Sequence, residues 1–295
     1  MRLILKYTIS KDEAGISLLT LLKKNDISKK TTIAIKHRGG KLLVNDEPKI
    51  VHHILSEGDQ VTVIFPEESR SSGLIGYKMN LNIIFEDDYL LVIDKPSGIA
   101  TIPSLRHPHK TLANGIIYYY DEQGIDSTIH FVNRLDRDTS GLLVVAKYRH
   151  IHHLLTQDIK QIKRKYVALV KGELLKQRDV INEPIAREKE GNVKRCVREG
   201  GQGSITHYHV LEKRNQATVV ECELETGRTH QIRVHMSHLG HPLIGDTLYD
   251  EKAIELDGGH LLHSYKLSFK HPITKKDYFF ETDIPESFCE RKKND

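Results

Sequence analysis

HFVNRLDRDTSGLLVVAK, the sequence of residues 130–147, joins a charged loop to a short apolar segment. The apolar part, residues 141–147, predicts a buried β-strand because it is short and rich in valine and leucine. The charged part then lies in a loop at the edge of a sheet, where Arg134 and Arg137 can keep the carboxyl group of Asp136 ionised. An ionised and positioned aspartate can act as a nucleophile or as a base. On the local pattern alone, a solvated loop of ion pairs is the commoner outcome.

A second informative segment is LETGRTHQIRVHM, residues 224–236. A strand is expected to end at Glu225, Gly227 to make a turn, and a helix to begin near Thr229. Helix N-termini and clustered arginines bind anions such as phosphate. One helical turn separates Thr229 from Arg233, a spacing that can place Arg233 beside a partner carboxylate. The alternative is an amphipathic helix whose arginines and histidines face water.

The histidines and cysteines do not indicate a metal site. The histidines in and after this predicted helix lack the H-E-x-x-H arrangement of a zinc site, and no cysteine pair accompanies them; they are His230, His235, His238 and His241. The three cysteines are odd in number and far apart, which favours reduced thiols in a cytoplasmic protein; they are Cys196, Cys222 and Cys289.

The sequence of residues 79–295, which we call the main domain, predicts an α+β fold with a mixed, largely antiparallel central sheet and flanking helices. Segments typical of strands are, in chain order, NIIFE, LLVIDK, GLLVVAK, KYVALVKG, THYHVLEK, ATVVECELE and KLSFKH. Helices are expected only over residues 111–122, 150–159 and 229–239. Strands in runs with scattered helices favour this class over a doubly wound fold.

The first 66 residues are expected to form a small separate module. Its predicted elements are, in order, a helix over 16–27, a helix that begins after an N-cap at Ser28 and stops at Gly39-Gly40, a strand pair that turns at 45–48, and a strand within GDQVTVIFPEE. The polar residues 67–78 are expected to form a linker, and residues 79–295 the main domain.

The charge of the chain is unevenly distributed. The 295 residues carry a formal net charge of +4, but residues 23–49 hold eight Lys/Arg against three Asp/Glu, and residues 160–198 hold twelve against five. Such basic surfaces suit RNA phosphates, although solvated strands and loops would carry the same charges. No apolar run approaches the roughly 18 residues of a membrane helix, and the first residues do not resemble a signal peptide.

The two motifs together resemble those of the RluA/RluD-type RNA pseudouridine synthases. HFVNRLDRDTSGLL resembles the active-site motif of that family, usually H-R-L-D-x-x-T-S-G, and TGRTHQIRVH resembles its second signature. Further matches follow in the family's order: EDDYLLVIDKPSG, KRKYVA, GHPLIGDTLY, LLHS and KHPITKK. Since these ordered matches span about residues 80–288, the local alternatives lose their weight. The N-terminal segment is similar to a divergent S4 RNA-binding module.

The resemblance implies a role for particular residues. Asp136 matches the catalytic aspartate, and Arg233 matches the arginine that pairs with it. Tyr166 matches the active-site tyrosine, whose ring stacks on the target base and whose hydroxyl can transfer a proton. Arg134 matches the arginine that helps to extrude the nucleotide, and Leu262 is expected to line the base pocket. A carboxylate beside the anomeric carbon suits cleavage of a glycosidic bond, as in retaining glycosidases.

The resemblance also implies RNA as the partner, with ribosomal RNA expected first and transfer RNA as an alternative. No metal or organic cofactor is expected, and the protein is expected to act as a monomer away from membranes. The basic side chains expected to contact RNA are Lys29, Lys30, Lys36, Arg38, Lys163, Arg164, Lys194 and Arg195.

Two other functions fit parts of the sequence. A non-catalytic RNA-binding or ribosome-assembly factor would fit the S4-like segment and Asn133, which stands where the family usually has a histidine. Against it stands the presence of Asp136, Tyr166 and Arg233 together. A glycosidase or hydrolase would use Asp136 and Asp138, but two carboxylates so close in one loop do not obviously flank a bond.

Overall fold

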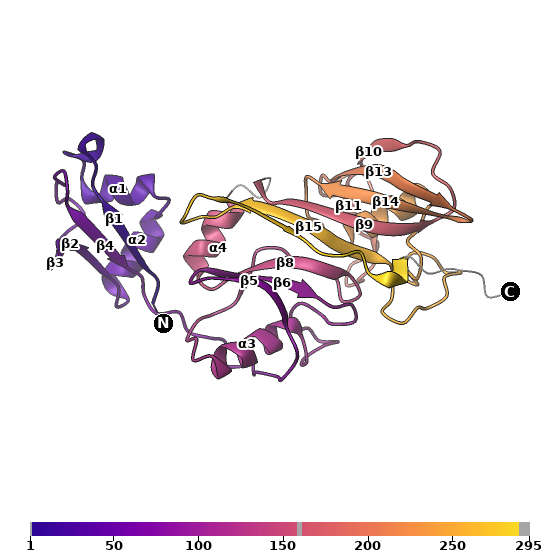
Figure 1. Cartoon of the computed structure of the whole chain (residues 1–295), viewed down its shortest axis with the longest axis horizontal. Coiled ribbons are helices and arrows are strands. Elements are labelled where there is room, and N and C mark those ends of the chain that lie inside the picture. Colours follow the sequence, from indigo (N-terminus) through magenta and orange to yellow (C-terminus); the bar gives the residue numbers. More distant parts are fainter. Residues whose placement is uncertain (1, 158–160, 289–295) are drawn as a thin grey trace.

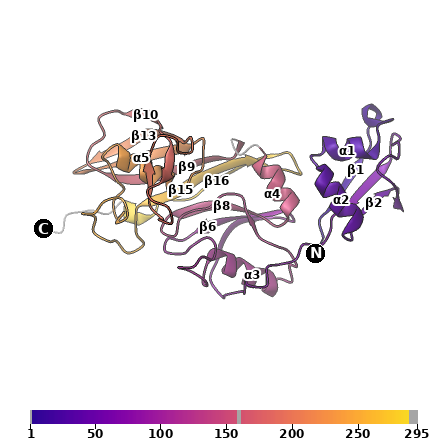
Figure 2. The same cartoon turned by 180° about the vertical axis from the view of Figure 1, so that it is seen from behind.

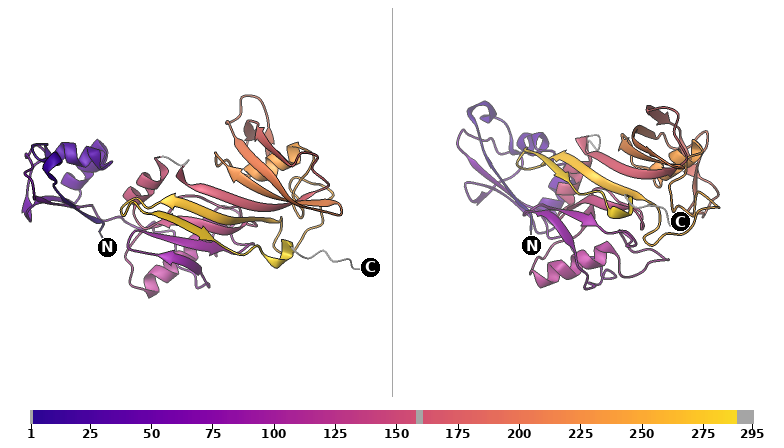
Figure 3. Two further views of the ribbon diagram at one scale, coloured as in Figure 1. Left: turned by 45° about the horizontal axis from the view of Figure 1, so that its top comes forward. Right: turned by 45° about the vertical axis from the view of Figure 1, so that its right-hand side comes forward.

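The chain forms a small N-terminal sheet and a long second sheet, which occupy separate parts of the molecule (Figure 1). This arrangement is seen in a computed structural model that describes residues 2–157 and 161–288. Helix α3 and helix α4 lie on opposite faces of the long sheet, and the views from behind and from oblique directions show the same separation of the two sheets (Figures 2 and 3). No helix among the described residues is long and apolar enough to cross a membrane.

The N-terminal sheet is antiparallel, with the strand order β1-β4-β2-β3, and it is consistent with an S4-like module. Its elements are β1 (Ile4–Thr8), a 3-10 turn (Lys11–Glu13), α1 (Leu18–Lys24), α2 (Lys29–His37), β2 (Lys41–Val44), β3 (Glu47–Pro48) and β4 (Gln60–Ile64). The predicted N-cap is confirmed, since the Ser28 hydroxyl accepts a hydrogen bond from the Thr31 amide at 3.1 Å. Strand β1 was not predicted.

The long sheet has ten strands and is mixed but mostly antiparallel, which confirms the predicted fold class. Its main path is β10-β13-β14-β9-β15-β8-β6-β5, with β16 added beside β15 and β7 beside β8. Its strands are β5 (Asn82–Glu86), β6 (Leu90–Lys95), β7 (His130–Phe131), β8 (Ser140–Ala146), β9 (Lys163–Lys171), β10 (Arg178–Asn182), β13 (Ile205–Arg214), β14 (Ala217–Leu224), β15 (Leu262–Lys270) and β16 (Asp277–Glu281). Outside it lies a two-stranded sheet of β11 (Ile185–Arg187) and β12 (Arg195–Val197).

Three α-helices accompany this sheet in the described residues, and each matches a predicted helix. They are α3 (Leu112–Glu122), α4 (Arg149–Thr156) and α5 (Gln231–His238), followed near the C-terminus by a 3-10 turn (Glu286–Phe288). The predicted helix over 150–159 extends beyond α4 to residues 158 and 159, which lie outside the described part of the chain.

Strands β6 and β8 contain continuous apolar runs, residues 90–93 and 142–146, because both faces of the sheet are covered there. Val92 and Val144 belong to a cluster that includes residues of α4, whereas Ile93 and Val145 belong to a second cluster that includes residues of α3. Successive side chains of a strand point to opposite faces, so a strand covered on both sides needs no polar alternation. This double covering explains why these strands could be recognised from their sequence.

The single parallel contact in the long sheet joins β8 to β15 and depends on a glycine. Gly141 pairs with Ser264 and has a φ of +108°, and a Cβ atom built on it would lie 2.3 Å from the carbonyl oxygen of Ser264. The neighbouring Ser140 hydroxyl lies 2.8 Å from Nδ1 of His263. The close approach brings the loop before β8 against the start of β15.

The segment between the two sheets is attached to the main domain. Phe65, at the end of the N-terminal module, stacks on His150 of α4 with 4.8 Å between ring centroids. The Glu68 carboxylate accepts a hydrogen bond from the Arg149 amide at 2.8 Å and lies 2.8 Å from Nε2 of His130. These contacts hold part of the expected linker against α4.

Replacing Gly141 by alanine should cost more stability than replacing Gly124, which follows α3. Both glycines have positive φ, but a Cβ at Gly124 would meet nothing within 4 Å, whereas one at Gly141 would collide with β15. We expect Gly124→Ala to lower the free energy of unfolding by about 1 kcal/mol and Gly141→Ala by about 3 kcal/mol or more. Urea denaturation measures both, and equal losses would contradict the close approach.

Candidate active site

The loop that carries Asp136 is fixed through its backbone by side chains at the end of β6 and in the segment after it. Three of its carbonyl groups accept hydrogen bonds, from Lys95 Nζ to Arg137 (3.0 Å), from Ser97 Oγ to Asp138 (2.7 Å) and from Thr101 Oγ1 to Leu135 (2.6 Å). Because the carbonyls are held, the loop keeps one conformation while the carboxylate of Asp136 remains available for chemistry.

Lys95 is fully buried and acts as the centre of this support. Its ammonium group also donates to the carbonyl oxygens of Pro96 at 2.8 Å and Ile99 at 2.9 Å, so its three N–H groups match three acceptors. Burial lowers the pKa of Lys95 to about 7, against the opposing effect of the nearby carboxylates of Asp138 and Asp136. The lysine therefore organises backbone here and does not face the solvent.

Asp136 forms an ion pair with Arg233 of α5. One oxygen of the Asp136 carboxylate lies 3.0 Å from Nη1 of Arg233. The other guanidinium nitrogens of Arg233 donate to both oxygens of Asp246, at 2.7 Å and 2.9 Å, and the guanidinium carbon lies 5.1 Å from the ring centroid of Tyr249. Arg233 thus bridges two carboxylates from distant parts of the chain.

The surroundings favour the ionised form of Asp136. Burial alone would raise its pKa, but electrostatic interactions with His230, Arg233 and His260 outweigh burial and hold the pKa below its usual range, the two histidines contributing at acidic pH, where they are protonated. Burial lowers the pKa of His230 and lowers that of His260 to about 4, so these imidazoles are uncharged at neutral pH. Arg233 is therefore the permanent cation that keeps Asp136 ionised at neutral pH.

His230, Tyr249 and Asp246 are site residues that the sequence analysis did not assign. His230 adopts a left-handed conformation, with a φ of 58°, at the start of α5. Its Nδ1 lies 2.8 Å from the Tyr249 hydroxyl, and its Nε2 lies 3.8 Å from a carboxylate oxygen of Asp136. Asp246 and Tyr249 occur within the matching segment GHPLIGDTLY, but only the folded chain shows that they surround Arg233.

Tyr166 and Leu262 line the apolar side of the same region. Tyr166 on β9 pairs with Ser264 on β15, and Leu262 on β15 pairs with Ala168 two positions along. Both Tyr166 and Leu262 are 5% exposed. Burial raises the pKa of Tyr166, and the nearby charge of Asp136 raises it further, so the hydroxyl is protonated at neutral pH.

The other residues of the Asp136 loop differ in their surroundings. Arg134 is exposed and has no hydrogen bond or ion pair with the described residues, whereas Arg137 is paired with Asp138 at 2.7 Å. Asn133 is buried and accepts a hydrogen bond from the Val144 amide at 2.9 Å, while its Nδ2 has no partner in the described part of the chain. One side of Asn133 therefore supports the loop.

The basic residues expected to face RNA lie in two environments. Most of them are exposed or half-buried: Lys29, Lys30, Lys36, Arg38, Lys163, Lys194 and Arg195. Arg164 differs from the expected surface position, since it is 5% exposed. Strand alternation places it on the face that Tyr166 shares, and two of its guanidinium nitrogens have no partner among residues 2–157 and 161–288.

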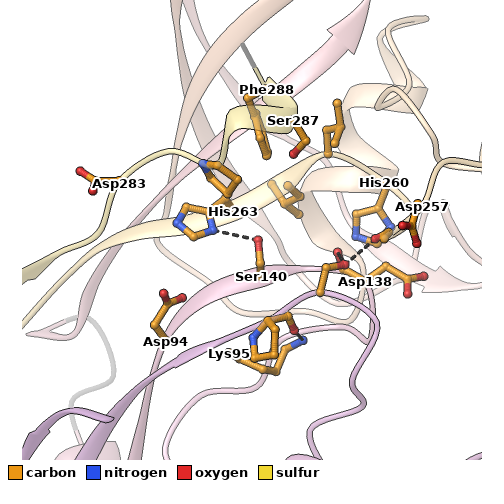
Figure 4. A pocket seen from close by; sticks show the side chains of 16 residues that line it. Asp94, Lys95, Asp138, Ser140, Asp257, His260, His263, Asp283, Ser287 and Phe288 are labelled. Atoms are coloured by element: carbon orange, nitrogen blue, oxygen red, sulfur yellow. Dashed lines mark hydrogen bonds between the residues drawn. The ribbon is translucent and has the colours of Figure 1, made fainter. Parts of the chain in front are cut away.

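A cavity of about 280 Å³ lies behind the Asp136 loop (Figure 4). Asp136 does not line it, but four other aspartates do: Asp94, Asp138, Asp257 and Asp283. Such a lining disfavours phosphate groups. No cluster of three or more His, Cys, Asp or Glu among the described residues is arranged to hold a metal ion.

Comparison with known proteins gives one consistent result. The family model described as RNA pseudouridylate synthase matches residues 89–238. A Bacillus subtilis protein named uncharacterized RNA pseudouridine synthase YjbO is 44% identical over 262 residues, covering 88% of this chain and 92% of that protein. Ribosomal large subunit pseudouridine synthase D of Nitrosomonas europaea is 36% identical over 79% of this chain and 70% of its own length. The structure of human RNA pseudouridylate synthase domain containing 1 superposes with a TM-score of 0.56 at 27% identity, over 70% of this chain and 85% of that one.

Removing the charge of Arg233 should raise the pKa of Asp136. We expect the double variant Arg233→Gln/Asp246→Asn, which leaves no unpaired charge at Asp246, to raise that pKa, because His230 and His260 then oppose the effect of burial without the guanidinium charge. The control Asp246→Asn keeps the cation, so its Asp136 should titrate well below the value found in the double variant. Carbon-13 NMR titration of the carboxyl group measures both, and an unchanged pKa in the double variant would contradict the role given to Arg233.

Proposed function

The chain belongs to the RNA pseudouridylate synthase family and is an isomerase, and from this premise we propose that it converts particular uridines of large-subunit ribosomal RNA to pseudouridine without a cofactor. The observation that carries the proposal is the ionised Asp136, paired with Arg233 and close to Tyr166. A non-catalytic RNA-binding protein would have no need to keep this arrangement.

Asp136 is proposed to act on the target nucleoside. The reaction breaks the bond between C1′ and N1, rotates the detached uracil and forms a bond between C1′ and C5, after which C5 loses its proton and N1 gains one. A carboxylate beside the anomeric carbon suits cleavage of the glycosidic bond, and a low pKa keeps that carboxylate in its reactive form. Arg233 holds the carboxylate in place through a hydrogen bond of 3.0 Å. The detached base stays in the site, so the product nucleoside is an isomer of the substrate nucleoside.

Tyr166 and Leu262 are proposed to receive the uracil ring, and Arg134 to help its entry. Both apolar surfaces are largely enclosed, which suits a base that has left its stack. The protonated hydroxyl of Tyr166 can donate a proton during the reaction. Arg134 is exposed and unpaired within the described residues, so its guanidinium is available to occupy the space that the base leaves.

Ribosomal RNA is proposed as the substrate because relatives 34–36% identical to this chain are named ribosomal large subunit pseudouridine synthase D. We further propose that residues 1–66 form an RNA-binding module, that 67–78 link it to the catalytic domain of residues 79–295, and that Lys29, Lys30, Lys36 and Arg38 contact RNA phosphates. Each residue of the proposed site lies in one chain, which supports action as a monomer.

Replacing Asp136 by asparagine should abolish the reaction and leave RNA binding intact. RNA that carries tritium at C5 of uridine releases tritium when pseudouridine forms. We expect release by Asp136→Asn to fall by at least about 10³-fold, because the reactive carboxylate is lost. The matched control Asp138→Asn, two residues away in the same loop, should retain release. Full activity of Asp136→Asn would refute the catalytic role.

The RNA substrate can be identified by comparing cells that have and lack this protein. We expect one or a few pseudouridines of large-subunit ribosomal RNA to disappear when the protein is removed, because the enzyme acts on positions it recognises. Chemical mapping of pseudouridine in ribosomal and transfer RNA makes the measurement. Loss of pseudouridines from transfer RNA alone would reject the ribosomal substrate. An indirect effect would be excluded if the wild-type protein, but not the Asp136→Asn variant, restores the missing pseudouridines.

A further inference from the structure

Three arginines converge on a cavity of about 430 Å³ beside the proposed active site: Arg187 of β11, Arg195 of β12 and Arg228 before α5. None of the described residues that line this cavity is acidic. None of the three arginines forms an ion pair with a carboxylate of residues 2–157 or 161–288. We call this cavity, together with Arg187, Arg195 and Arg228, the arginine pocket.

The arginine pocket holds positive charges at positions where their mutual repulsion destabilises a pair of β-strands. The register of β11 and β12 places Arg187 directly opposite Arg195. Like charges at opposite positions of an antiparallel pair repel and destabilise the pair. The guanidinium hydrogen bonds on two of the arginines go to backbone carbonyls only, from Arg187 to Asn192 at 3.4 Å and from Arg228 to Gly203 at 3.2 Å. A bound anion would remove this repulsion and fill the unused donors.

The walls of the arginine pocket are held by backbone contacts. Ile185 of β11 exchanges two hydrogen bonds with Gln202, at 2.9 Å and 2.8 Å. A Cβ atom built on Gly201 would lie 2.8 Å from the carbonyl carbon of Ile185, so only glycine permits this approach. The arginines therefore project from a built frame, and an anion can bind without first ordering a loop.

The arginine pocket is connected to Asp136 by a short path. Arg228 lies two residues before His230, whose Nε2 is 3.8 Å from the Asp136 carboxylate. The backbone amide of Arg195 donates to the Tyr249 hydroxyl at 3.0 Å, and that hydroxyl lies 2.8 Å from Nδ1 of His230. Helix α5, which carries Arg233, contacts β12 and lies at the end of the molecule away from the N-terminal sheet (Figure 2).

We propose that the arginine pocket binds a backbone phosphate of the RNA next to the target uridine. This inference rests on the proposed function and adds a subsite to it. Guanidinium groups match phosphate oxygens with paired hydrogen bonds, and Arg228 of the pocket lies two residues before His230, whose ring is next to the Asp136 carboxylate. A nucleotide that leaves its stack turns about its own backbone, so a fixed neighbouring phosphate determines where the base arrives.

The test compares the double variant Arg187→Gln/Arg228→Gln with the double variant Arg149→Gln/Arg106→Gln. Both remove two positive charges, but Arg149 and Arg106 are exposed residues that do not line the arginine pocket. Binding of purified ribosomal RNA is measured by filter retention at several salt concentrations. We expect the pocket variant to bind about tenfold more weakly at physiological salt and its salt slope to fall by about 0.7, the loss of one phosphate contact on a single strand.

Several outcomes would overturn the inference. Equal weakening in both double variants would show that net charge alone matters, and unchanged binding in the pocket variant would exclude an RNA phosphate there. A second experiment titrates the wild-type protein with inorganic phosphate. If phosphate binding saturates but the affinity for RNA is unchanged by the two pocket substitutions, the pocket is a site for free anions and the inference fails.

Failure of the proposed function has a different signature. Absence of tritium release from wild-type protein would reject the enzyme activity, while a lower salt slope in the pocket variant would still support the phosphate subsite. Normal tritium release with an unchanged salt slope would reject the subsite alone. Absence of RNA binding by the wild-type protein would reject both.

Discussion

The guanidinium group of Arg233 joins three parts of the chain that are far apart in sequence. It is held against α5, donates two hydrogen bonds to Asp246 and one to Asp136, and is almost fully buried. A buried cation with two carboxylate partners is tolerated because its donors are satisfied, whereas removal of one partner leaves an uncompensated charge. The orientation of the α5 segment, the loop before β8 and the segment after α5 is therefore set by one side chain.

The long sheet positions the Asp136 loop so that its carboxylate can reach Arg233. The Asp136 loop enters β8 where that strand pairs in parallel with β15, and Gly141 allows the two backbones to approach. Lys95, from the adjacent strand β6, and the residues after it hold the same loop from the other side through its carbonyl groups. The position of the carboxylate thus rests on hydrogen bonds to the backbone of its loop as well as on its ion pair with Arg233.

Much of the long sheet could be predicted because its central strands are covered on both faces and contain continuous apolar runs. Strand β10, which has one buried residue, and the three-residue strands β11 and β12 have no such pattern and were missed. Asp136, Tyr166 and Arg233 could be named from motif resemblance, but the part played by Asp246 could not. Its partner Arg233 lies 13 residues earlier, and only the packing of α5 reveals the pair. Arg164 was placed on the surface from its basic neighbours, although strand alternation turns it inward.

The formal net charge of +4 conceals an opposition of charge around the Asp136 loop. The arginine pocket presents three guanidinium groups, whereas the cavity behind the loop is lined by four carboxylates and one lysine, Lys95. The phosphates of an RNA strand are attracted to the arginine pocket and repelled by the aspartate-lined cavity. The RNA backbone can therefore cross the site along the arginines. Because both sets of charges are fixed to the scaffold that holds Asp136, the field that guides the backbone and the carboxylate that meets the nucleoside keep a constant relative position. Electrostatic guidance of this kind selects the approach of the strand without reading its bases, which leaves the choice of uridine to RNA shape and to the unstacked nucleotide.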